Sequence, residues 1–199
     1  MSKQSAQHDA IVIAIDKLRS VNLSERCPQL GLPVPENDRL RLRALGKNLN
    51  VSMPDFSVLD ADSGKPIKSG DQLLVLHYLL CEAPVVLAGT LISFRGYPEG
   101  QFYWQPFQAR TVNPLLGRIG NDLDLLREHL NRFDWEPVDI GDFGARIHII
   151  GPLELTLSYH LGDDEFPPSA DVLFDACITK IFVAEDAAVL ASRICLGLL

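Results

Sequence analysis

Two stretches of alternating apolar and polar residues constrain the fold of this chain more than any other feature. Residues 39–53 alternate about a short turn at Gly46-Lys47, and residues 145–161 alternate about Gly151-Pro152. An alternation of period two predicts a strand with one buried face, and a short glycine-containing turn joins neighbouring strands into a hairpin. The sequence therefore predicts an antiparallel sheet built from two hairpins.

Four other segments space their apolar residues by three and four, which is typical of a helix with one buried face. They are residues 5–21, residues 72–81 after the capping sequence Ser69-Gly70-Asp71, a stretch from Asn113 to Leu130 that Gly117 and Gly120 could split with Asn121 as a second cap, and a last helix from Glu185-Asp186. We expect an α+β fold, with a mainly antiparallel sheet flanked by four or so helices.

The length of 199 residues and an apolar content of 47% fit a single globular domain over residues 1–199. Three prolines between Cys27 and Pro35 predict an extended connector over residues 27–38, since proline cannot continue a helix. This connector leads from the N-terminal helix into a main body, residues 39–199. Within that body, glycines and prolines between Phe94 and Arg110 predict a long loop or a strand pair.

The net charge and the apolar runs limit the partners that we expect, and the cysteines indicate the cellular compartment. The formal net charge of -8 repels phosphate backbones, so we expect no nucleic-acid partner. Every apolar run is too short to cross a membrane, so we expect no membrane partner. The cysteines form no CxxC pair, hence no local iron-sulfur or zinc motif is evident, and reduced thiols in a cytoplasmic protein are expected. They are Cys27, Cys81, Cys177 and Cys195.

An acidic block over residues 162–175 is the strongest candidate for a site. Asp163, Asp164 and Glu165 directly follow the second predicted hairpin and precede Pro167-Pro168, which stiffens the backbone. Hard divalent cations prefer such oxygen ligands, so these three residues predict a metal site. A solvated acidic turn that caps its own backbone is the alternative.

Several smaller groups of residues allow two interpretations each. Asp171 and Asp175 would share one face if their segment is helical, with Ser169 as its cap. His77 and Cys81 could hold a soft metal, or they could be ordinary buried side chains.

For two more segments, a purely structural role is the alternative to a binding site. Residues 60–71 resemble a calcium loop but lack its glycine and its final glutamate, so an ordinary turn is expected. The aromatic residues between Arg95 and Arg110 could clamp a planar or anionic ligand, or could simply cover the core.

Residues 72–80, 91–95, 102–103 and above all 162–175 resemble an uncharacterised family, domain of unknown function 3786. The resemblance runs from about Arg39 to the C-terminus. It implies a protein of anaerobic bacteria or archaea, and some members resemble iron-sulfur proteins through an attached cysteine-rich segment that this chain lacks. It also implies a shared pocket formed by Asp163, Asp164, Glu165, Asp175, His77, Tyr78, Arg95 and Tyr103.

These observations favour a cytoplasmic small-ligand or metal-binding accessory protein of anaerobic metabolism. One alternative is a divalent-metal-dependent enzyme, in which residues 163–165 hold the cation and His77 or His160 moves protons. Another is a protein-interaction module anchored by the aromatic segment. The expected partner is thus an unidentified small ligand or a protein, a divalent cation is the one cofactor suggested, and the sequence leaves open whether the chain is an enzyme.

Overall fold

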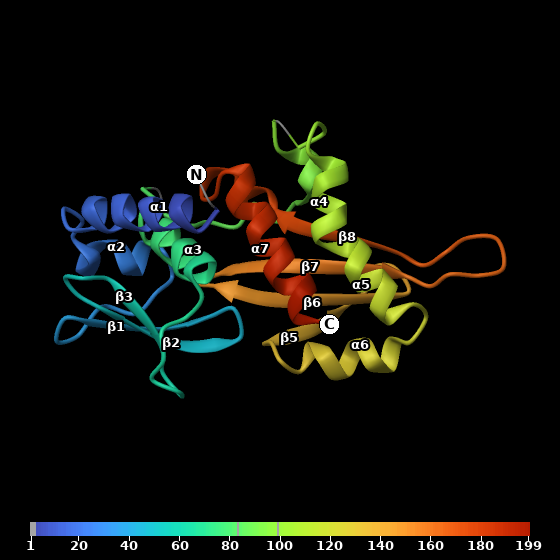
Figure 1. The fold of residues 1–199 in the computed structure, drawn as a ribbon, viewed down its shortest axis with the longest axis horizontal. Coiled ribbons are helices and arrows are strands. Elements are labelled where there is room, and N and C mark those ends of the chain that lie inside the picture. The colour runs from blue at the N-terminus through green and yellow to red at the C-terminus, as the bar shows by residue number, and fades with distance from the viewer. Residues whose placement is uncertain (1–2, 83, 99) are drawn as a thin grey trace. The chain divides into compact units, whose positions relative to one another are not determined.

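The computed structural model describes residues 3–82, 84–98 and 100–199. The chain divides into two compact units, one running to Val86 with residues 150–152 added, and one formed by residues 87–149 and 153–199. Both units combine helices with antiparallel strands (Figure 1), so the predicted α+β class is confirmed. The single-domain organisation expected from the sequence stays a prediction.

The first unit contains three strands in the order β3-β2-β1. Their bounds are β1 Arg39–Ala44, β2 Lys47–Ser52 and β3 Ser57–Asp60. The predicted first hairpin is confirmed, with Leu42 opposite Leu49. Strand β3 was not predicted, because four residues carry too short a pattern to be recognised.

The helices of the first unit are α1 Lys3–Leu18, α2 Leu23–Gln29 and α3 Ser69–Leu79. The expected end of α1 at Val21 was wrong, since Asn22 caps α2 by accepting a hydrogen bond from the Ser24 amide. The connector expected from Cys27 begins later, because Cys27 and Pro28 still lie in α2. Because proline has no amide hydrogen, Pro28 leaves this short helix with one backbone hydrogen bond fewer.

The start of α3 also differs from expectation. Its N-cap residue is Lys68, whose side chain makes no capping hydrogen bond, so Ser69-Gly70-Asp71 forms the first turn and does not precede it. Asp71 then lies in that first turn, where a carboxylate is favoured by the helix dipole.

The second unit contains five strands in the order β5-β6-β7-β8-β4. Their bounds are β4 Leu91–Ser93, β5 Trp135–Val138, β6 Phe143–Ile150, β7 Leu153–His160 and β8 Ser169–Asp175. Strands β6 and β7 confirm the second predicted hairpin. The last residue of β6, Ile150, belongs to the first unit and is paired there with Ala44.

Strand β8 corrects the helix considered for its residues. Ala170, Val172 and Phe174 are buried in alternation along it, which is the period of a strand. Asp171 and Asp175 do share a face, but they lie four strand residues, or about 13 Å, apart. They are therefore not the close neighbours that one helix turn would have produced.

The helices of the second unit are η1 Phe94–Gly96, α4 Trp104–Arg110, α5 Val112–Ile119, α6 Leu123–Leu130, η2 Ala176–Lys180 and α7 Ala184–Gly197. The predicted loop or strand pair after Phe94 was thus wrong. Pro106 is compatible with α4 because it occupies the first turn, where no intrahelical amide bond is needed.

The long helical stretch before residue 131 does split, as expected, at Gly120, which has a positive φ of 55°. Gly117 stays inside α5, and the cap of α6 is Asp122 instead of Asn121, with its carboxylate accepting from the Leu125 amide. The helix from residue 185 is confirmed as α7.

The sheet of the second unit has two unlike faces. Ile147, Leu155 and Leu157 are buried on one face, because alternate residues of a strand share a face. In Figure 1, α5 and α7 cross the sheet. The alternate residues, among them Arg146 and Thr156, point to the opposite face, which we call the open face. In the described part of the chain, no helix is long and apolar enough to span a membrane.

Candidate functional site

A depression of about 510 Å³ lies on the open face of the second unit and is called the sheet-face pocket. Strands β6 and β7, the ends of β4 and β8, the segment before β4 and the β5–β6 connection all contribute to it. Its lining residues are Leu87, Gly89, Leu91, Val138, Asp139, Ile140, Arg146, Glu154, Thr156 and Asp175.

Two glutamates hold Arg146, the cationic side chain that lines this pocket, in place. The Nη1 atom of Arg146 lies 2.9 Å from Oε1 of Glu136 on β5, and its Nε atom lies 3.6 Å from Oε2 of Glu154 on β7. The Arg146 side chain is therefore positioned across three adjacent strands.

Thr156 is the most deeply buried polar residue of the lining, with 4% of its surface exposed. Strand alternation turns its side chain to the open face, toward the pocket, and its hydroxyl makes no hydrogen bond with any described residue. A hydroxyl that is not hydrogen-bonded to the protein can donate to or accept from a molecule in the pocket, so this group is available to a ligand.

Asp175 fastens the wall of the pocket. Its Oδ1 atom accepts from the amides of Ala88 and Cys177, both at 2.8 Å, and its Oδ2 atom accepts from the Gly89 amide at 2.7 Å. Burial opposes ionisation of Asp175, but these donors outweigh it, so the pKa of Asp175 lies below its usual value. The residue holds residues 87–89 against the end of β8.

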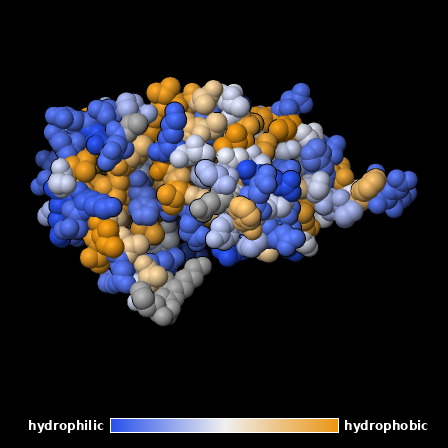
Figure 2. Space-filling model, turned by 90° about the horizontal axis from the view of Figure 1, so that it is seen from above, coloured by the Kyte–Doolittle hydropathy of each residue, from blue (hydrophilic) through white to orange (hydrophobic). Residues whose placement is uncertain are grey.

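Within the acidic block, residues 162–168 lie in the loop between β7 and β8, which extends away from the rest of the second unit in Figure 1 and is mostly hydrophilic in Figure 2. Oδ1 of Asp163 accepts from the amides of Glu165 and Phe166, both at 2.8 Å. The Phe166 and Glu165 amides lower the pKa of Asp163. Asp164 and Glu165 are exposed.

The structure does not bring residues 163–165 and Asp175 together. Residues 163–165 precede the first residue of β8, whereas Asp175 is its last, and the strand itself is about 20 Å long. Asp175 is the only one of the eight predicted site residues that lines the sheet-face pocket.

His77 and Tyr78 lie on α3 in the first unit, whereas the sheet-face pocket belongs to the second unit. The Tyr78 hydroxyl is buried and donates to the Leu30 carbonyl at 2.6 Å. A Cβ atom at Gly151 would lie 2.3 Å from this hydroxyl, so only glycine fits beside it. Tyr78 therefore holds the first unit together.

Arg95 and Tyr103 border the aromatic segment. The Arg95 guanidinium lies 4.4 Å from the Trp104 ring centre, which favours a cation–π contact. Phe94 and Phe107 are buried and stack at 4.2 Å, whereas Tyr103 is 56% exposed. This segment thus covers the core with some rings and presents others to solvent, and it shares no lining residue with the sheet-face pocket.

His160 lies beside two polar groups on the open face. Its Nε2 atom is 3.4 Å from the Ser158 hydroxyl, and its Nδ1 atom is 3.9 Å from Oδ2 of Asp142. A serine nucleophile needs a base that a third group orients, but the 3.9 Å between Nδ1 of His160 and Oδ2 of Asp142 is too long for a hydrogen bond. The arrangement therefore does not present a usable nucleophile.

Among the described residues, no group of three or more His, Cys, Asp and Glu side chains is arranged to hold a metal ion. The four cysteines are buried and form no disulfide among the described residues. Burial raises the pKa of Cys27 to about 11 and that of Cys195 to about 12. Burial and the neighbouring Asp175 raise the pKa of Cys177 to about 12, so these three thiols stay protonated at neutral pH.

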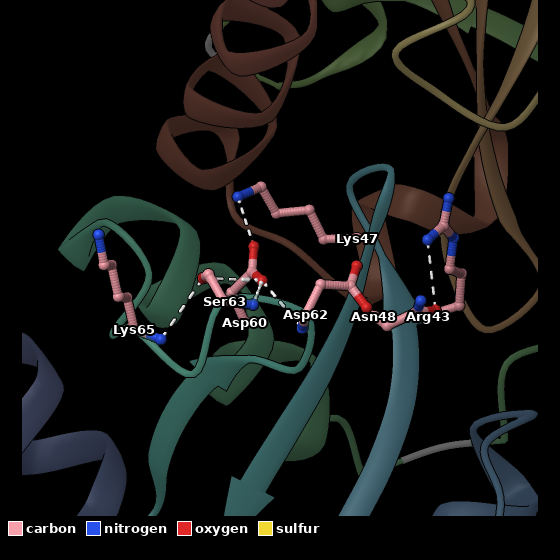
Figure 3. Close-up of polar contacts among 7 residues, drawn as sticks. All are labelled: Arg43, Lys47, Asn48, Asp60, Asp62, Ser63 and Lys65. Atoms are coloured by element: carbon pink, nitrogen blue, oxygen red, sulfur yellow. Dashed lines mark hydrogen bonds and ion pairs between the residues drawn. The ribbon is translucent and has the colours of Figure 1, made fainter.

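The segment that resembles a calcium loop is a turn built on Asp60 (Figure 3). Oδ1 of Asp60 accepts from the amides of Asp62 and Ser63, and Oδ2 lies 2.8 Å from Nζ of Lys47. The Lys47 and Ser63 hydrogen bonds lower the pKa of Asp60. Its carboxylate is therefore engaged within the turn.

The fold and the pocket together define an α+β protein with a concave site of small-molecule size. The sequence profile of one family, described as Domain of unknown function (DUF3786), matches residues 22–196, and the chain belongs to this family. Comparison with curated proteins and with solved structures found no match in either set.

Sequence reasoning missed Asp139, Arg146, Glu154 and Thr156. The alternation that predicted β6 and β7 contained the signal for three of them, because the residues between the buried positions must point to the other face. Asp139 lies in a connection, where periodicity says nothing about neighbours.

Proposed function

We propose that this protein binds a small organic ligand and that the sheet-face pocket is the binding site. The observation that carries the proposal is Thr156, a residue with 4% of its surface exposed, whose hydroxyl has no hydrogen bond among the described residues and is turned toward a depression of about 510 Å³. Pockets for small molecules typically measure 300–1,000 Å³ and combine apolar walls with a few fixed polar groups.

The fixed geometry of the lining supports the same proposal. Arg146 is held between two glutamates, and Asp175 ties the segment at Gly89 to β8 through backbone amides. Binding is stronger when the groups that contact a ligand are already ordered, because less conformational entropy is lost. We therefore place the ligand here and not at residues 163–165, where Asp163 already binds its own loop.

The proposal retains the cytoplasmic location expected from the sequence, because four cysteines without a disulfide among the described residues fit a reducing compartment. A role in anaerobic metabolism and a metal-dependent activity at residues 163–165 stay predictions. The first comes from the family resemblance alone.

The test is a screen of the full chain against a library of small metabolites by two-dimensional amide NMR. We expect shift changes that gather at residues lining the pocket. Leu91→Trp should weaken or abolish them, since Leu91 lines the pocket and is 49% exposed, so that the larger indole obstructs part of the depression. Circular dichroism checks that this variant folds.

Phe102→Ser is the matched control, because Phe102 is 87% exposed and lies outside the pocket. It should bind as the wild type does. Shift changes that persist undiminished in Leu91→Trp, or that gather around Phe102, would contradict the proposal.

A further inference from the structure

We infer that the ligand of the sheet-face pocket is a small organic cation, an ammonium group carried on a short hydrocarbon body. This inference rests on the proposed ligand-binding function and names the class of molecule that the pocket selects. It follows from three properties of the lining: its charge, its available acceptors and its apolar walls.

The charge of the lining is negative. Three carboxylates, those of Asp139, Glu154 and Asp175, face one guanidinium, that of Arg146. Arg146 is already paired at 2.9 Å with Glu136, which lies outside the lining, so its charge is balanced before any ligand arrives. A concave surface of one sign attracts ligands of the other, and the net charge of -8 acts in the same direction.

The acceptors that remain available suit an ammonium group. Asp175 has its oxygens engaged by three backbone amides. Glu154 lies 3.6 Å from Arg146, longer than a normal hydrogen bond, and Asp139 is exposed with no partner among the described residues. With the Thr156 hydroxyl, they supply acceptors for an ion that carries three donors and no acceptor.

The walls of the pocket suit a hydrocarbon body. Leu87, Leu91, Val138 and Ile140 line the same depression as the polar groups. Burying each methylene of a ligand against such walls contributes about 0.8 kcal/mol. An amphipathic cation therefore satisfies the whole lining, whereas a carboxylate of the same length would meet Asp139 and Glu154 with like charge.

The experiment compares three probes of equal length, hexylammonium, hexanoate and hexanol, by titration calorimetry on the full chain at low salt. We expect hexylammonium to bind at least about tenfold more tightly than either other probe, as one charge-assisted hydrogen bond predicts. Raising the salt should weaken hexylammonium binding and leave hexanol nearly unchanged.

Variants of the lining residues test whether hexylammonium binds in the pocket. Asp139→Asn and Glu154→Gln should each weaken hexylammonium binding about tenfold, and Thr156→Val should weaken it less. Asp171→Asn is the matched control: Asp171 is exposed on the open face of β8 but does not line the pocket, and its removal should change nothing. Asp139 lies in an exposed connection, so its variant stays informative if Glu154→Gln does not fold.

The outcomes separate the two proposals. Tighter binding of hexanoate, lost in Arg146→Gln, would overturn the cation and leave a ligand-binding pocket. Equal binding of all three probes would also overturn the preference for a cation and leave a ligand-binding pocket. If no probe binds and the metabolite screen also finds no ligand at the pocket, both proposals fail.

Discussion

The loop before β8 and the end of β8 use the same chemistry in different ways. Asp163 accepts from amides two and three residues ahead of it, so it shapes only its own loop. Asp175 accepts from amides 87 and 86 residues away, at Ala88 and Gly89, so it joins distant parts of the second unit. Backbone amides thus hold both carboxylates. Asp163 stabilises only its own loop, whereas Asp175 ties the wall of the pocket to the end of β8.

The largest expected effect is that of Asp175→Ala. Three backbone donors lose a charged acceptor, and we expect the free energy of unfolding to fall by about 2 kcal/mol or more. Urea unfolding followed by circular dichroism measures the change. An effect no larger than that of Asp163→Ala would break the distinction between the two carboxylates.

Tyr78→Phe tests a second long-range contact, in the first unit. The Leu30 carbonyl would lose its 2.6 Å hydrogen bond in a buried place, so we expect a loss of about 1–2 kcal/mol in the free energy of unfolding. Ligand binding at the sheet-face pocket should stay unchanged, as measured by calorimetry. A loss of binding without a loss of stability would restore Tyr78 as a site residue.

At acid pH, the difference in the free energy of unfolding between the wild type and Asp175→Asn should disappear. The folded pKa of Asp175 is lowered, so its contribution is complete above its unfolded pKa of about 3.9 and is lost as the pH falls through the folded value. Urea midpoints measured from pH 6 to pH 2 should therefore converge at the acid end. A constant difference over that range would show that ionised Asp175 is not the stabilising form.

Asp163→Ala should have a smaller effect on global stability, because the lost hydrogen bonds lie within one exposed loop. We expect faster amide hydrogen exchange at Glu165 and Phe166 and little change elsewhere. Hydrogen-exchange NMR distinguishes this local effect from a global one. Faster exchange at Ala88 or Gly89 in this variant would contradict it.

Phe102→Ser should have the smallest effect. The ring is 87% exposed, so the free energy of unfolding should stay within about 0.5 kcal/mol of the wild type. The same urea titration checks it. A larger change would mean that the exposed aromatic residues contribute to the fold.

The sequence predicted the fold best where one face of an element is buried. The hairpins at residues 39–53 and 145–161 were found because apolar and polar residues alternate along them. Strand β8 was missed because Leu173, between Val172 and Phe174, makes its apolar residues contiguous and hides the alternation. Strand β5 was missed because it is short and contains Pro137, which an edge strand can accommodate.

The candidate site was harder to predict than the fold. Composition drew attention to residues 163–165, where charge is dense, but a dense run of carboxylates is mainly solvated. The sheet-face pocket spreads its polar groups over several strands and a connection, one or two to each, so no segment of the sequence contains enough of them to be noticed.

The sequence by itself determined which residues of β6 and β7 face the core, because side chains alternate along any strand. It also determined the tight turns at Asp60 and Asp163, because a short carboxylate reaches amides two or three residues ahead. Only the tertiary structure decided that Asp175 meets Gly89 and that Thr156 lies under a depression. Such contacts depend on which strands become neighbours, and that choice is made by packing across the whole unit and not by any local pattern.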